Sequence, residues 1–352
     1  MIPDAFGRAL TVGVEEEVMI LDAETLELSP SVDVLVRALE GRTLPGIVKT
    51  ELFASVVELA TGVCESVQEA VESLRVLRQE AAAAAAEHGL VLATAGSHPT
   101  SRAVDQTIAP DERYRGFVEY AGTTARRQGV NGLHVHVGMP DRDACFRSLE
   151  NVLPWLPLVL ALSANSPYFD GDETGMLSTR AEVLALLPRR GAPPAFRSYA
   201  DWEAFVGRFV ASGLVKDYTN FWWDVRPHPR FGTLEIRAPD QPTEPARTEA
   251  LVRLLHRLCA WALDAPPREY DPPARGVYDQ NRWAAARFGP HGKLVHPDRA
   301  EALPVAQLAA ELPVPLDGLD PRTCEADRQL ELGRTEGLRA VCADLVARSA
   351  VR

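Results

Sequence analysis

The sequence predicts an α+β fold, in which hairpin-like pairs of strands are combined with helices. The chain has 352 residues, of which 46% are hydrophobic and 24% are charged, so it has the composition of a folded protein with a sizeable core. Strand-like segments occur in pairs between helical segments. No βαβ unit is repeated, which disfavours a doubly wound parallel sheet.

Strands are predicted where β-branched and large apolar residues are bounded by turn residues. The segment 220–242 contains two further strand-like runs joined by a Pro/Gly turn. The single predicted strands are 11–21, 47–60 and 132–140, together with a buried strand that ends in a loop within 90–99.

Helices are predicted where strong helix formers carry apolar residues at helical spacing. The clearest is 65–88, which Gly89 is placed to end. The others are 142–163, 201–212, 243–263 and, after a Pro-rich stretch, the amphipathic 320–350. Because no long linker precedes the tail, we expect a sheet domain at 1–265 and a helical extension at 266–352 packed on it.

The net charge of −12 excludes a general nucleic-acid-binding protein, because such proteins need clustered Lys and Arg. The N-terminus has no signal-peptide pattern, and the apolar stretch 152–164 is short and contains two prolines. We therefore expect a cytoplasmic protein without a membrane partner. Five widely spaced cysteines without a C-x-x-C pair predict neither a disulfide framework nor a zinc site: Cys64, Cys145, Cys259, Cys324 and Cys342.

The first predicted strand, in "GVEEEVMILD", carries three consecutive glutamates. Alternate residues of a strand share a face, so Glu15 and Glu17 point one way and Glu16 the other. Two adjacent buried carboxylates repel each other unless a cation or a shared proton neutralises them. The pair therefore indicates a metal site or, as the alternative, a solvent-facing edge strand. If the pair forms a metal site, Glu16 points away from it and we expect Glu16 to be dispensable.

A second acidic segment, "KTELFASVVELATG", contributes Glu51 and Glu58. Seven residues is an odd spacing, so in an unbroken strand the two side chains would lie on opposite faces. They can share a site only if a bulge or a change of direction separates them. The alternative is one glutamate in a buried salt bridge and one exposed.

The strand "GLHVHVG" places His134 and His136 on one face. Histidines at this spacing are common metal ligands, which raises the alternative of a metal-dependent hydrolase. No H-E-x-x-H motif is present, and His98 in "GSHP" is the only nearby candidate for a third ligand. Two core histidines held by hydrogen bonds remain a further alternative.

The segment "TLEIRAPD" places Glu235 and Arg237 on one strand face. An arginine is suited to a phosphate, which its planar guanidinium binds through two hydrogen bonds. The alternative is a surface ion pair. Several glutamates with one or two histidines favour Mg²⁺ or Mn²⁺ over zinc. The combination indicates nucleotide chemistry, although neither a P-loop nor a Rossmann motif is present.

These motifs resemble the glutamate–cysteine ligase type 2 family, or carboxylate–amine ligases, of the glutamine synthetase/guanido kinase-type fold. The resemblance covers most of residues 10–260 and extends to "NRWAAARFG" at 281–289. It implies an open, mainly antiparallel sheet flanked by helices. The matching segments are "GVEEE", "TELFASVVELAT", "AGSHP", "GLHVHVG", "ALSANSPYFDGDETGMLSTR" and "WWDVRPHPRFGTLEIRAPD".

The resemblance also implies roles for residues that match the family's motifs. Glu15 and Glu17 would bind different ions, out of two or three Mg²⁺ or Mn²⁺, between ATP and an amino acid. Arg237 would contact the γ-phosphate, and Arg226 is a second candidate for phosphate contact. The other implied residues are Glu51 and Glu58 with Glu17, His134 and Glu235 with Glu15, and Asn165, Ser166 and Arg180 on the substrate side.

The implied reaction joins a carboxylate to an amine at the expense of ATP, through an acyl phosphate. Glutamate and cysteine would be the substrates, and the resemblance alone suggests a homodimer. The alternatives are a hydrolase on the His134/His136 strand, a non-catalytic nucleotide-binding relative, and a phosphagen-type kinase. A ligase differs from a hydrolase because it releases ADP only when its substrates are present.

Overall fold

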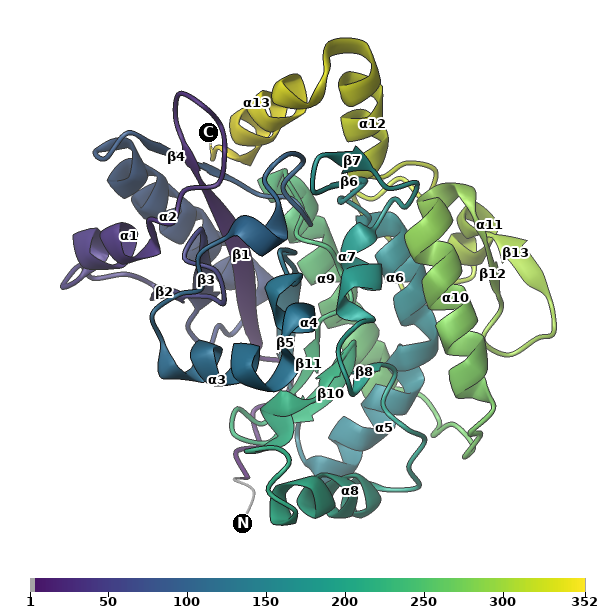
Figure 1. Ribbon diagram of the computed structural model, residues 1–352. Helices are drawn as coiled ribbons and strands as arrows, with labels where there is room; N and C mark the ends of the chain where they lie inside the picture. Colours follow the sequence, from purple (N-terminus) through teal and green to yellow (C-terminus); the bar gives the residue numbers. More distant parts are fainter. Residues whose placement is uncertain (1–3, 352) are drawn as a thin grey trace.

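One antiparallel sheet organises the computed structural model, which describes residues 4–351 (Figure 1). Six strands follow the order β10-β11-β5-β1-β3-β2, and a seventh, β4, pairs with the second half of β1. All pairings within this sheet are antiparallel. This confirms the predicted α+β class with an open sheet.

The glutamate-bearing strand β1 (Val12–Asp22) lies between β5 and β3. It is therefore an internal strand, and the solvent-facing edge strand considered as an alternative is wrong. The other strands of the sheet are β2 (Gly46–Thr50), β3 (Val56–Thr61), β4 (Leu90–Ala93), β5 (Leu133–Gly138), β10 (Val225–His228) and β11 (Thr233–Ile236).

The single strand predicted at 47–60 is wrong, because the chain reverses there and forms the hairpin β2–β3. The turn spans residues 51–55 and is closed by a hydrogen bond from Val56 N to Phe53 O. No Gly or Pro lies between 47 and 60, so the usual sequence signs of a reversal are missing. The segment 90–99 forms β4 at Leu90–Ala93 and then a loop, in agreement with the predicted strand that ends in a loop.

The long predicted helices are confirmed. Helix α2 (Val67–Ala86) begins after Ser66, whose side chain accepts a hydrogen bond from Glu69 N. The predicted helix 142–163 consists of α5 (Arg142–Val152), a short 3₁₀ turn at Pro154, and α6 (Leu156–Ser163). By length and composition this segment could cross a membrane, but 83% of its apolar window is buried inside the protein, as in a core helix.

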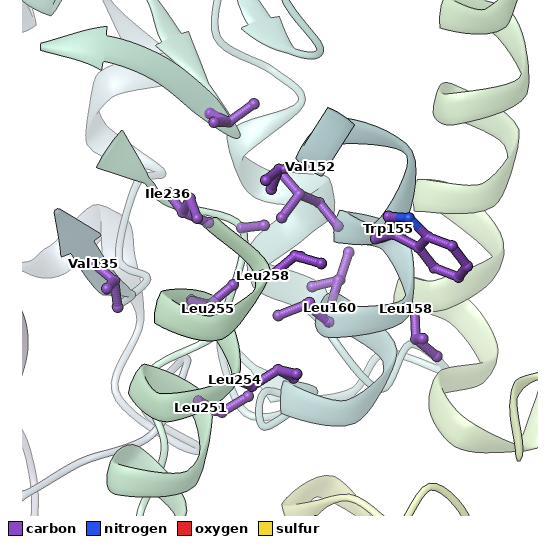
Figure 2. Packing of buried hydrophobic residues seen from close by; sticks show 14 of the residues in the cluster. Val135, Val152, Trp155, Leu158, Leu160, Ile236, Leu251, Leu254, Leu255 and Leu258 are labelled. Carbon is purple, nitrogen blue, oxygen red and sulfur yellow. The ribbon is translucent and has the colours of Figure 1, made fainter. Parts of the chain in front are cut away.

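The largest core lies between the sheet and the helices α5, α6 and α9 (Pro245–Asp264) (Figure 2). Val135 and Ile236 face it from the sheet, while Leu251 and Leu255 face it from α9. Figure 2 also shows Trp155 and Leu158 on the far side, next to α10. All five cysteines are buried and carry free thiols. This agrees with their wide spacing in the sequence, which predicted no disulfide framework.

The C-terminal segment wraps around the sheet region. Helix α10 (Ala274–Phe288) lies beside α6, and the predicted amphipathic segment 320–350 forms two helices, α12 (Glu325–Glu336) and α13 (Leu338–Ser349), which Gly337 separates (Figure 1). Residues of α13 pack against β1 and β4. This packing supports our proposal of a 266–352 extension joined to the 1–265 unit.

The remaining elements are short, apart from α8, and lie around the sheet. The described helices among them are α1 (Val32–Leu39), α3 (Glu112–Ala121), α4 (Thr123–Arg126), α7 (Thr179–Leu184), α8 (Tyr199–Ala211) and α11 (Val305–Ala310). The strands are β6 (Tyr168–Phe169), β7 (Asp172–Glu173), β8 (Arg190–Gly191), β9 (Trp222–Trp223), β12 (Lys293–Val295) and β13 (Ala302–Pro304). The 3₁₀ turns are η1 (Ala103–Asp105), η2 (Leu153–Trp155), η3 (Tyr218–Asn220) and η4 (Gly289–His291).

Candidate active site

The pairing of the strands gathers most of the predicted site residues on one face of the sheet. Residues directly opposite each other in neighbouring strands share a face. Glu15 lies opposite His134, and Glu17 lies opposite Glu58. Further along, Glu235 lies opposite both His136 and Arg226. We call this face the acidic cradle; it consists of Glu15, Glu17, Lys49, Glu51, Glu58, His134, His136, Arg226, Glu235 and Arg237.

One part of the acidic cradle surrounds Glu15 with histidines. Glu15 Oε2 lies 3.3 Å from His134 Nδ1, and Glu15 Oε1 lies 3.8 Å from His136 Nε2. Burial and the guanidinium of Arg237 lower the pKa of His134 to about 3, so its imidazole is neutral at pH 7. A neutral imidazole keeps a lone pair available for a ligand.

A second part of the acidic cradle gathers three glutamates. Burial, followed by the nearby charge of Glu51, raises the pKa of Glu17 to about 7. Burial also raises the pKa of Glu58, with added contributions from Glu15 and Glu51. The hairpin reversal at 51–55 therefore brings Glu51 and Glu58 together, which is the change of direction that their odd spacing required.

Arginines hold the third part of the acidic cradle. Arg226 binds Glu235 through Nε and Nη2, at 2.6 and 3.1 Å, while its Nη1 donates to the carbonyls of Thr219 and Phe221. Arg237 Nη1 lies 2.6 Å from Glu235 Oε1. Burial opposes ionisation of Glu235, but the two guanidiniums outweigh it and hold the pKa well below its usual range. The Arg237 side chain is 20% exposed, so solvent or a ligand can reach it.

Asn165 and Ser166 lie in a buried polar network around Asp240. Both are completely buried, and Asn165 N and Ser166 Oγ donate to the carboxylate of Asp240. Asn165 Oδ1 accepts a hydrogen bond from Gln329 of α12. Both side chains thus lie in a polar network behind the acidic cradle, and their expected place on the substrate side stays a prediction.

Arg180 joins that network to the acidic cradle. Its guanidinium donates to the carbonyls of Ala238 and Arg237 and lies 3.8 Å from Asp240. Gly132 lies directly against it, and a side chain at that position would collide with the guanidinium. Gly132 N also donates to Glu17. The Arg180 side chain is therefore buried behind the acidic cradle. Its positive charge lowers the pKa of Glu17 and so opposes the effect of burial.

Glu16 faces away from the acidic cradle, as predicted, and its contacts there indicate a role in the fold that the expected dispensability did not include. It is fully buried and forms a two-point ion pair with Arg78 of α2, with distances of 2.6 and 2.7 Å. Gln241 and Thr248 donate to the same carboxylate. The third glutamate therefore attaches β1 to the helices behind the sheet.

Two residues were missed at the sequence level, Lys49 in the acidic cradle and Asp240 in the network behind it. Lys49 Nζ lies 2.7 Å from Glu58 Oε1. Lys49 could have been recognised from its spacing, because it stands two residues before Glu51 and alternate residues of a strand share a face. Asp240 ends the "RAPD" segment and could have been recognised as a buried carboxylate after a strand. The expected third histidine is not His98, which binds the carbonyl of Leu26. His228 instead packs edge-on against His136 at 5.3 Å between ring centroids.

Within residues 4–351, no three His, Cys, Asp or Glu side chains converge as a ready-made metal site. The carboxylates pair instead with cations of the protein, namely Lys49 at Glu58 and two arginines at Glu235. The donor set nevertheless fits a hard divalent cation, because buried carboxylates and a neutral imidazole face one another. His136 Nε2 is buried without a hydrogen-bond partner and faces Glu15.

Comparison with known proteins identifies the family. A family model described as glutamate-cysteine ligase family 2 matches residues 11–335. The chain belongs to this family. It is accordingly a ligase of the group that forms a C–N bond, and the resemblance seen in the motifs is confirmed.

The family 2 ligase has similar relatives in bacteria and archaea. A protein named putative glutamate–cysteine ligase 2-3 from Rubrobacter xylanophilus is 41% identical over 284 residues, which cover 81% of this chain and 77% of the relative. A protein named glutamate–cysteine ligase from Halobacterium salinarum is 38% identical over 293 residues, covering 82% and 81%.

Solved structures show the same fold at low sequence identity. A glutamate–cysteine ligase of Francisella tularensis in complex with AMP has a TM-score of 0.69 and 14% identity, covering 98% of this chain and 89% of that one. A bifunctional glutathione synthetase from Pasteurella multocida has a TM-score of 0.68 and 14% identity, covering 97% and 53%. These similarities confirm the predicted fold class.

Proposed function

We propose that this family 2 ligase is an ATP-dependent carboxylate–amine ligase that forms γ-glutamyl–cysteine or a related γ-glutamyl amide. The observation that carries the proposal is the acidic cradle, in which buried glutamates lie beside a partly exposed arginine, Arg237. Such a face suits a nucleotide with its divalent cations. The names of the relatives and the AMP complex of the Francisella enzyme support the same substrates.

The side chains of the acidic cradle would hold two or three Mg²⁺ or Mn²⁺ ions. When bound, these ions neutralise phosphate charge and orient phosphate oxygens. Glu17, Glu51 and Glu58 form one group of donors, while Glu15 and His134 form another next to Glu235. Keeping His134 neutral is the contribution of burial and of Arg237.

The proposed reaction has two steps. An oxygen of the substrate carboxylate attacks the γ-phosphorus of ATP, the bond to the β-phosphate oxygen breaks, and ADP leaves. The amine nitrogen then attacks the acyl carbon, inorganic phosphate leaves, and the nitrogen loses a proton to give the amide. Positioning and charge stabilisation account for most of the catalysis, because no protein nucleophile is needed.

Arg237 is the proposed catalytic contact to the transferred phosphoryl group, since its guanidinium is partly exposed. Arg226 is more deeply buried, and its Nε, Nη1 and Nη2 donate to Glu235 and two carbonyls. We therefore assign Arg226 the positioning of Glu235 in place of the expected direct phosphate contact. Arg180 and the Asp240 network support the same strands from behind.

The test incubates the protein with ATP, Mg²⁺, glutamate and a panel of amines that includes cysteine. ADP release and a product mass equal to acid plus amine minus water are measured together. Arg237→Ala and Glu15→Gln should each lower kcat by about 10²–10³-fold, the usual effect of removing one charge-stabilising group. Arg334→Ala, an exposed arginine paired with Glu173, is the matched control and should retain full activity.

The hydrolase and the non-catalytic relative would each give a different result in this experiment. A hydrolase on the His134/His136 strand would act without nucleotide and would lose activity to a zinc-selective chelator. A non-catalytic relative would bind ATP and release no ADP with any pair of substrates. If ADP release is unaffected by Arg237→Ala, the assigned role of the acidic cradle is wrong even if the product forms.

A further inference from the structure

Lys49 extends from β2, the last strand of the sheet, into the acidic cradle. Its Nζ lies 2.7 Å from Glu58 Oε1 and 4.0 Å from Glu15 Oε1. The Glu58 side chain is only 5% exposed, whereas that of Lys49 is 42% exposed. The ammonium is therefore the protein's own cation at a buried carboxylate, and it reaches that carboxylate from the solvent side.

The choice of lysine at this position is unusual for this chain. Of 37 basic residues only three are lysines, and the other two, Lys216 and Lys293, are exposed. At Glu235, by contrast, the cations are arginines: Arg226 donates through Nε and Nη2, and Arg237 donates through Nη1. A lysine ammonium is a compact charge on a flexible stem and forms no such fixed fork. It can leave a carboxylate more easily than Arg226 can leave Glu235.

Glu58 is also one of the three glutamates proposed to hold a divalent cation with Glu17 and Glu51. With the ammonium 2.7 Å from Glu58 Oε1, a divalent cation bound to the same buried carboxylate would lie next to a positive charge, so the two cations repel each other at Glu58. We propose that Lys49 is an internal counter-ion that occupies the acidic cradle in the metal-free protein and competes with the divalent cation for Glu58. Lys49 thereby lowers the metal affinity of the free site. This inference rests on the proposed function, because it assumes the metal role of Glu58.

The test measures Mn²⁺ binding to the nucleotide-free protein from the electron paramagnetic resonance signal of free Mn²⁺. Lys49→Met removes the charge and retains an unbranched side chain of similar length. This variant should bind Mn²⁺ about fivefold more tightly than the wild type, the size expected for loss of one partly exposed ion pair. Lys49→Arg retains the charge and should bind Mn²⁺ no more tightly than the wild type, and Lys293→Met is the matched control at an exposed lysine.

A thermal unfolding series provides the second measurement. Without metal, Lys49→Met should have a lower Tm than the wild type, because Glu58 loses its partner. Saturating Mn²⁺ should bring the two Tm values together. The Tm of the metal-free protein is measured in Ca²⁺-free buffer that contains a chelator.

The inference is overturned if Lys49→Met binds Mn²⁺ no more tightly than the wild type, or if Lys49→Arg behaves like Lys49→Met. If the wild type binds no Mn²⁺, both this inference and the proposed metal site are wrong. Failure of the ligase assignment is recognised separately, because these titrations contain no ATP, glutamate or amine. Absence of amide formation with an intact Lys49 effect would leave the counter-ion role in place.

Discussion

Three consecutive glutamates of β1 show how strongly the surroundings determine the chemistry of a residue. Glu15 lies beside two histidines, Glu16 pairs with Arg78 behind the sheet, and Glu17 is crowded by Glu51. The pKa of Glu17 is raised to about 7, whereas that of Glu16 is lowered, although burial favours the neutral form of both. The difference comes from the sign of the neighbouring charge.

At the residue scale, the contribution of His98 to the stability of the folded state should depend on pH. It is buried, its Nε2 lies 3.0 Å from Leu26 O, and Thr100 N and Ser101 N donate to its Nδ1. Burial lowers its pKa below the ordinary 6.5. A lowered histidine pKa stabilises the folded state above pH 6.5, and this contribution is lost as pH falls through the folded pKa.

We therefore expect the Tm difference between the wild type and His98→Gln to shrink as pH is lowered from 7 to 5. The measurement is thermal unfolding in a pH series. His88→Gln is the control, because His88 is exposed at the end of α2. A Tm difference that stays constant with pH would show that protonation of His98 does not affect stability.

At the scale of elements, the register of the strands creates the acidic cradle. The β2–β3 reversal turns an odd sequence spacing into a shared face, and β5 places its histidines between β1 and β11. The opposite face of β1 packs on α2 through the Glu16–Arg78 ion pair. One strand therefore carries the proposed chemistry on one face and a structural charge on the other.

Removing one partner of this buried ion pair should be costly. We expect Arg78→Met to lower the free energy of unfolding by about 3–5 kcal/mol, because Glu16 would remain buried and unpaired. The double variant Glu16→Leu, Arg78→Met should recover part of that loss. Urea denaturation provides the measurement, with Arg75→Met as control on the exposed face of α2. Equal losses in the single and double variants would contradict this explanation.

At the scale of the whole molecule, the C-terminal extension supports the site from a distance. Gln329 of α12 donates to Asn165, which in turn binds Asp240, and Asp240 faces Arg180 behind the acidic cradle. Ser349 of α13 accepts a hydrogen bond from Arg78 through its carbonyl. The extension therefore contributes hydrogen-bond partners to two buried polar networks of the first 265 residues, one at Asn165 and one at Arg78.

Gln329→Ala should lower the free energy of unfolding by about 1–3 kcal/mol, since Asn165 would lose a buried hydrogen-bond partner. Arg328→Ala, in the preceding position and paired with Asp344 at the surface, is the matched control and should change stability little. Chemical denaturation of both variants measures the difference. Similar effects of the two substitutions would show that the Gln329–Asn165 contact is not important for the fold.

The sequence by itself determined the fold class, most of the helices, and the alternation that puts Glu15, Glu17, His134 and His136 on shared faces. These features follow from local periodicity and from motifs that are contiguous in the chain. Only the tertiary structure decided that the chain reverses at 51–55 and that Asn165 and Ser166 lie behind the acidic cradle. It also decided that Lys49 forms an ion pair with Glu58. A local pattern records which face a side chain takes, but the partner across that face is set by packing between distant segments.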